Sequence, residues 1–131
     1  MSATKIVPEQ LQADLEQFDG TEEYHRLTLN RRLVATDGVK YLCEAAEAFW
    51  LVDAIGSYQP RCARDPMLRR MQFWKLTVDL EKHDGKLTCE RDAGDVVITQ
   101  RIPYTDFPLA SIRIWVEAGD DLMVAMLPGE R

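Results

Sequence analysis

The chain has 131 residues, of which 46% are hydrophobic and 29% are charged, and its formal net charge is −6. This length predicts one domain over residues 1–131, and the composition is typical of a globular protein. No stretch of about 18 residues lacks charge, and the opening MSATKIVPEQ has no apolar signal-peptide core. We therefore expect neither a membrane span nor secretion. Three widely spaced cysteines do not resemble a disulfide framework and predict reduced thiols in a cytoplasm.

The negative charge is concentrated near the start of the chain. Between Glu9 and Glu23 there are six acidic residues and no Lys or Arg, which accounts for the whole net charge. A basic cluster follows the middle of the chain and comprises Arg61, Arg64, Arg69 and Arg70. Because the remainder of the chain is neutral, the surface as a whole lacks the net basic character that phosphate binding needs, which disfavours nucleic acid as a partner.

The first predicted elements are a helix over about 8–18 and a strand over about 24–29. Proline suits the first position of a helix, and Leu11 and Leu15 recur at helical spacing after Pro8. The following segment alternates and places His25 on the same face as two leucines, which predicts a half-buried strand.

The strongest helix signal covers about 37–58. Thr36 or Asp37 can cap its start, and apolar residues then recur along one stripe, namely Val39, Leu42, Cys43, Ala46, Phe49 and Trp50. Around residues 49–55 the segment is apolar on most sides, which predicts that this long helix is largely buried. Pro60 prevents its continuation.

Residues from about 71 to 127 alternate with a period of two and are interrupted by short turns such as Asp84-Gly85. Strands joined by such turns are antiparallel neighbours. We therefore predict an α+β fold, in which N-terminal helices pack on one face of an antiparallel sheet of about five strands, arranged mostly as a meander.

The search for chemistry finds no phosphate-binding loop, no G-x-S-x-G, no H-E-x-x-H and no C-x-x-C, so no cofactor or metal is predicted. His25 is the most interesting titratable residue, although a histidine hydrogen-bonded in the core is more common than a general base. If a pocket exists, we expect it where the strand of His25 meets the helix start at Asp37 and Tyr41.

Several motifs occur in a fixed order, namely TDGVKYL, FWLVDAI, FWKLTV, LTC, YTDFPL and LPGE. In this pattern the chain resembles a family of small uncharacterised proteins from bacterial genomes, phages and plasmids, defined as a domain of unknown function. The resemblance extends from about Phe18 to Glu130. It implies an α+β domain and an origin in mobile elements, and it implies no activity and no catalytic residues.

Three hypotheses for function follow. The first is a non-enzymatic interaction or modulator protein that binds a partner protein or a second copy of itself, with the arginine cluster and the acidic first helix as partner-facing segments. The second is an acidic DNA-mimic inhibitor, which the confinement of the acids to one short segment disfavours. The third is a small enzyme that uses His25 and a nearby carboxylate, for which a concave pocket around His25 would be required.

Overall fold

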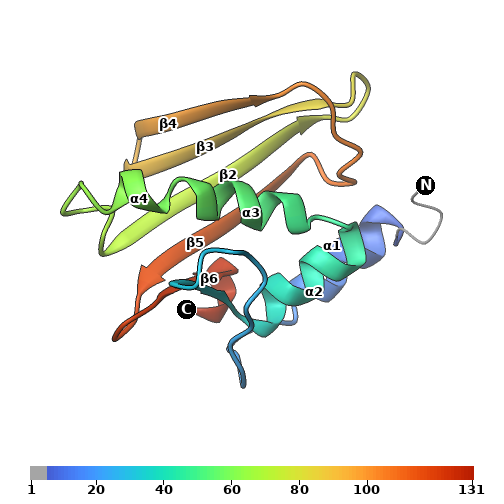
Figure 1. Ribbon diagram of the computed structural model, residues 1–131. Coiled ribbons are helices and arrows are strands. Elements are labelled where there is room, and N and C mark those ends of the chain that lie inside the picture. Colours follow the sequence, from blue (N-terminus) through green and yellow to red (C-terminus); the bar gives the residue numbers. More distant parts are fainter. Residues whose placement is uncertain (1–5) are drawn as a thin grey trace.

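The computed structural model describes residues 6–131 and consists of a sheet with helices packed on one face (Figure 1). The helices are α1 (Pro8–Leu15), α2 (Asp37–Ala46), α3 (Phe49–Ser57), α4 (Gln59–Cys62) and the 3₁₀ helix η1 (Pro128–Glu130). The strands are β1 (Leu33–Ala35), β2 (Met71–Asp79), β3 (Asp84–Asp92), β4 (Asp95–Ile102), β5 (Ser111–Ala118) and β6 (Met123–Met126). The predicted α+β class is confirmed. In the described part of the chain, no helix combines the length and the apolar character that crossing a bilayer requires.

The six strands are ordered β1-β6-β5-β2-β3-β4, and β1 is parallel to β6 while the other pairs are antiparallel. Strands β2, β3 and β4 follow one another through short turns, as predicted. Strand β5 then returns to pair with β2, which is the order of a Greek key. The predicted antiparallel sheet of about five strands, mostly a meander, is therefore only partly right, because the sheet includes the parallel pair of β1 with β6 and the path after β4 is not a meander.

Strand β1 was not predicted from the sequence, and the strand that was predicted over 24–29 does not form. In that segment only His25 pairs with the sheet, through a single bridge to Ala35, and Leu29 is 98% exposed. All three residues of β1 are buried, so its sequence shows no alternation of apolar and polar positions. A period of two identifies half-buried strands and therefore cannot identify this one.

The helix predicted over 37–58 is two helices, α2 and α3, separated at Glu47. Glu47 adopts the left-handed conformation, with φ 53° and ψ 47°, and the backbone N–H of Ala48 donates to the carbonyl of Cys43. This turn redirects the chain, so that Leu51 and Ile55 are buried while Phe49 is 42% exposed. Glycine or asparagine usually marks such a helix end, and neither is present here.

The main core lies between the helices and the sheet and contains Trp74, Leu76 and Ile114 from the strands together with Leu42 and Ile55 from the helices. Trp74 is 1% exposed, and Trp50 is partly buried and packs against this core. A second, smaller cluster is made by Val34, Val124 and Met126, with Trp115 and Leu122 packed against it.

Replacing Glu47 by glycine should stabilise the protein. Glycine adopts the left-handed conformation without the steric cost that a side chain carries, and the Glu47 side chain is exposed. We expect a gain of about 0.5–1 kcal/mol in the free energy of unfolding, measured by urea denaturation. Glu44→Gly, in the exposed middle of α2, is the control and should cost about 1 kcal/mol. A loss of stability in Glu47→Gly would contradict the described break.

Candidate functional site

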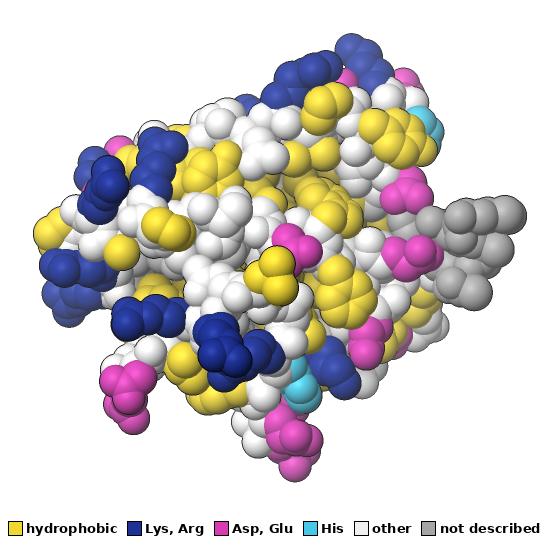
Figure 2. Space-filling model, viewed as in Figure 1, with side chains coloured by type: hydrophobic (Ala, Val, Ile, Leu, Met, Phe, Trp, Pro, Cys, Tyr) yellow, Lys and Arg dark blue, Asp and Glu magenta, His cyan; other side chains and the backbone are white. Residues whose placement is uncertain are grey.

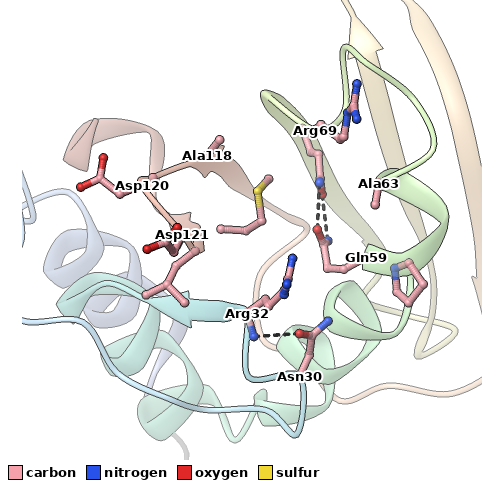
Figure 3. A pocket seen from close by; sticks show the side chains of 13 residues that line it. Asn30, Arg32, Gln59, Ala63, Arg69, Ala118, Asp120 and Asp121 are labelled. Carbon is pink, nitrogen blue, oxygen red and sulfur yellow. Dashed lines mark hydrogen bonds between the residues drawn. The ribbon is translucent and has the colours of Figure 1, made fainter.

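A cleft of about 780 Å³ lies near one end of the molecule. It lies between the loop that follows β5, the segment that precedes β1, and the beginnings of α4 and β2 (Figure 3). Residues 118–123 form one wall, Asn30 and Arg32 the lower edge, and Gln59, Arg69 and Gln72 the opposite wall and floor. Segments distant in the sequence therefore meet at this cleft.

The floor of the cleft is a buried pair of glutamine side chains. The amide nitrogens of Gln59 and Gln72 each donate to the other's oxygen at 2.9 Å. Their remaining hydrogens go to the carbonyls of Ile55 and Leu68, both at 3.0 Å, and the Trp74 indole donates to the Gln72 oxygen at 2.8 Å. Because every amide hydrogen has a partner, this network forms a fixed polar floor rather than a reactive group.

The lining of the cleft carries charges of both signs, from Arg32 and Arg69 and from Asp120 and Asp121. The backbone N–H of Arg32 donates to the Asn30 side chain at 2.9 Å, and the Asn30 amide donates to the carbonyl of Gly56 at 3.2 Å. These bonds hold the segment in place, and the Arg32 side chain extends into the cleft (Figure 3). Within residues 6–131, neither guanidinium group forms an ion pair.

The structure divides the predicted arginine cluster between two places. Arg69 lines the cleft, whereas Arg61 donates to the carbonyl of Val97 on the edge strand β4 at 2.9 Å and lines, with Arg64, a separate shallow hollow. Arg70 is exposed. Figure 2 shows basic side chains gathered at the end of the helical face that carries α4, while several acidic ones lie toward α1. Helices α1 and α4 lie at opposite ends of this layer, so the two charged segments do not meet within one chain (Figure 1).

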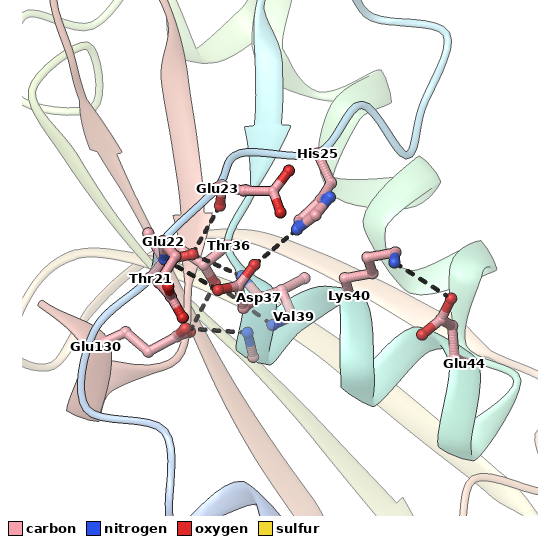
Figure 4. A network of polar contacts seen from close by, with 11 residues as sticks. Thr21, Glu22, Glu23, His25, Thr36, Asp37, Val39, Lys40, Glu44 and Glu130 are labelled. Carbon is pink, nitrogen blue, oxygen red and sulfur yellow. Dashed lines mark hydrogen bonds and ion pairs between the residues drawn. The ribbon is translucent and has the colours of Figure 1, made fainter.

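The predicted site at His25, Asp37 and Tyr41 is brought together only in part, with His25 beside Asp37 (Figure 4). The His25 Nε2 atom lies 2.7 Å from Asp37 Oδ1, and the Asp37 carboxylate also accepts the backbone N–H of Glu22 at 2.9 Å. This backbone bond, followed by the bond to His25, lowers the pKa of Asp37 below its ordinary value. The Tyr41 hydroxyl instead donates to Asp14 on α1, which raises the pKa of Tyr41. His25 and Asp37 therefore attach the segment before β1 to the start of α2.

A second carboxylate, that of Glu130, is buried at the start of α2 (Figure 4). It accepts the Thr36 hydroxyl at 2.6 Å and the backbone N–H groups of Gly38 at 3.0 Å and Leu127 at 2.9 Å. A helix N-terminus favours negative charge. A Cβ atom on Gly38 would lie 2.6 Å from a Glu130 oxygen, so only glycine leaves room for this carboxylate.

The three cysteines do not supply a reactive thiolate. Burial raises the pKa of Cys43 and Cys89 to about 12 and that of Cys62 to about 11. Among residues 6–131, no group of three His, Cys, Asp or Glu side chains is placed to hold a metal ion.

Sequence reasoning did not identify Arg32, Gln59, Gln72 or Glu130. One signal for Gln72 was present, because it is in phase with the inward-facing Trp74 and Leu76 of β2. A polar residue at such a position indicates a buried hydrogen-bond network. No comparable signal marked Arg32, since its place depends on how the segment before β1 packs against α3.

Comparison with known proteins identifies the family. A model described as "Family of unknown function (DUF6876)" matches residues 9–131. The chain belongs to this family. The resemblance to a domain of unknown function is thereby confirmed, and the matched range includes the cleft and the start of α2 in this DUF6876 protein. No curated protein and no solved structure matches the chain significantly.

Glu130→Gln should destabilise this DUF6876 protein by about 2–3 kcal/mol, because an amide cannot accept all the hydrogen bonds that the buried carboxylate accepts. The free energy of unfolding in urea measures the loss. The control is Glu117→Gln, which weakens only a surface pair with Arg131 at 3.0 Å and should cost less than about 1 kcal/mol. Equal stability of the two variants would show that Glu130 does not hold the start of α2.

Asp37 should make stability depend on pH in the acid range. Its folded pKa lies below the ordinary value of 3.8, so its contribution is present above that value and is lost as the pH falls through the folded pKa. The difference in unfolding free energy between wild type and Asp37→Asn should therefore shrink below about pH 4. Urea titrations at a series of pH values measure it, and a difference that does not change with pH would contradict this role.

Proposed function

We propose that this protein is a non-enzymatic interaction protein that binds an acidic segment of a partner protein in the cleft. The observation that supports this most strongly is the pair of arginines, Arg32 and Arg69, which line the cleft without forming an ion pair among the described residues. A guanidinium group offers a planar fork of donors that matches a carboxylate. Two such groups beside a fixed polar floor suit two acidic side chains of a bound segment.

The aspartates on the other wall of the cleft restrict which charged residues can bind beside them. Asp120 and Asp121 are exposed carboxylates on this wall. They would repel an acidic residue on their side and attract a basic one. The cleft therefore favours acidic residues near Arg32 and Arg69 and disfavours them near Asp120 and Asp121.

Binding is better supported than catalysis. His25 and Asp37 are 2.7 Å apart, but Asp37 also accepts a backbone N–H, and His25 does not line the cleft. The buried thiols have raised pKa values. Neither arrangement places a nucleophile, a base and a space for substrate together, which a mechanism needs. A DNA mimic is less well supported, since its acids would have to cover a face at phosphate-like intervals.

A second copy of the chain is the simplest partner. Residues 9–23 carry an excess of negative charge at one end of the helical layer, and the cleft lies toward the other end. The two cannot neutralise each other within one chain, but they can between copies arranged head to tail. A host or mobile-element protein with a similar acidic segment would bind in the same way.

Sedimentation of the full chain at about 0.05 M and 0.5 M salt tests the proposal, because the higher salt screens exposed charges. We expect association at low salt, its loss at high salt, and its loss in the double variant Arg32→Glu, Arg69→Glu. The control, Arg64→Glu with Arg70→Glu, makes the same change of charge outside the cleft and should associate like wild type. A labelled peptide covering residues 9–23 and an oligoglutamate peptide serve as direct probes.

Two results would overturn the proposal. In the first, the cleft variant and its control behave alike. In the second, the wild type stays monomeric at low salt and binds neither peptide.

A further inference from the structure

The face of the sheet opposite the helices carries a band of basic side chains. Alternate residues of β2, β3, β4 and β5 point to this face, and four of them are exposed cations, namely Lys75, Lys86, Arg101 and Arg113. They lie on four adjacent strands. At the ordinary separation of strands the band extends about 14 Å across the sheet.

The register of the strands places these cations directly opposite one another. Lys75 pairs with Arg113 across β2 and β5, and Lys86 pairs with Arg101 across β3 and β4. Like charges directly opposite destabilise a sheet. None of the four forms an ion pair within residues 6–131. Folding alone therefore does not account for this arrangement, whereas binding of a polyanion does.

An aromatic pair adjoins the basic band on the same face. Phe73 and Trp115 pair across β2 and β5 in the row next to Lys75 and Arg113, and their ring centroids are 5.4 Å apart with the planes at 85°. Both rings are only partly buried. Together with Lys75, Arg113 and Glu90 they line a hollow of about 300 Å³. Such a hollow offers aromatic surface beside two cations.

From these observations we propose that the open sheet face binds single-stranded nucleic acid. Lys75 and Arg113 with the rest of the basic band contact phosphates, and an unpaired base enters the hollow and stacks on Phe73 or Trp115. Glu90 and Asp92, which also line the hollow, can accept hydrogen bonds from the amino group of a base. Ser111, Thr77 and Thr88 add hydroxyl groups along the same path.

Single strands fit this face better than the other polyanions. A duplex keeps its bases stacked and offers no free ring to the aromatic hollow, and an acidic protein segment has carboxylates but no requirement for aromatic stacking. The net charge of −6 describes the whole chain, and this proposal concerns the part of one face where Lys75 lies opposite Arg113 and Lys86 lies opposite Arg101. It is independent of the proposed function at the cleft.

Fluorescence anisotropy with a labelled single strand of about 12 nucleotides tests the proposal. Binding should weaken with salt, with a slope of log K against log salt of about −3 for four phosphate contacts. The double variant Lys75→Gln, Arg113→Gln should bind at least about tenfold more weakly, and the slope should fall in magnitude by about 1.4. Arg64→Gln with Arg70→Gln is the control of equal charge change and should bind like wild type, as should the cleft variant.

Thermal melting separates lost binding from lost folding. Because Lys75→Gln with Arg113→Gln removes a repulsive pair, its melting temperature should equal or exceed that of wild type. Absence of binding at about 0.05 M salt would overturn the proposal, as would equal weakening in the control or equal affinity for the matching duplex. Binding of oligoglutamate to this face without binding of the single strand would also overturn it and would assign the face to an acidic protein.

Discussion

The structure depends above all on the buried carboxylate of Glu130 at the first turn of α2. Its bonds to Thr36 and Gly38 attach the end of the chain to the start of this helix. The N–H of Thr36 in turn donates to the carbonyl of Ala125 on β6, and Asp37 holds the segment around Glu22 and His25. The start of α2 therefore holds both the segment around Glu130 and the segment around Glu22 and His25. Strand β1, which directly precedes Thr36, is kept beside β6, and the segment before β1 is kept at the cleft.

The charges of this protein fall into two groups according to whether they have a partner inside the chain. Arg91 bonds both Asp65, at 2.7 Å, and Asp95, at 2.8 Å, and so joins the loop before β2 to the β3–β4 hairpin. The arginines of the cleft and the cations of the open sheet face have no such carboxylate among the described residues. Arg91 is thus a cation that stabilises the fold through its pairs, whereas the cations of the cleft and of the open sheet face are unpaired among the described residues. This contrast supports recognition as the role of the protein.

The fold class could be predicted from the sequence, but the irregular parts of the fold could not. The β2–β3 hairpin followed from strict alternation around Asp84-Gly85, because a half-buried strand leaves that pattern. Strand β1 left no pattern because all three of its residues are buried. The break at Glu47 was missed because a residue other than glycine adopts the left-handed conformation there. Each miss occurred where tertiary packing overrides local preference.

The candidate sites show the same division between local and long-range information. The contact of His25 with Asp37 agrees with the neighbourhood expected from the sequence, since both residues flank β1. The cleft required knowledge of how four separate segments meet, and the opposed cations of the open face required the register of β2 with β5. Neither is encoded in the spacing of residues along the chain. The arginine cluster could be recognised in the sequence. The sequence did not show that Arg69 lies at the cleft while Arg61 bonds to β4.

We propose that the cations of the cleft and the cations of the open sheet face form two separate binding surfaces. The most direct test is a pair of NMR titrations of the labelled protein, one with a single-stranded oligonucleotide and one with the peptide of residues 9–23. We expect the oligonucleotide to shift the amide signals around Lys75, Arg113 and Trp115, and the peptide to shift those around Arg32 and Arg69. Shifts at one common surface for both ligands, or no saturable shifts with either, would contradict it.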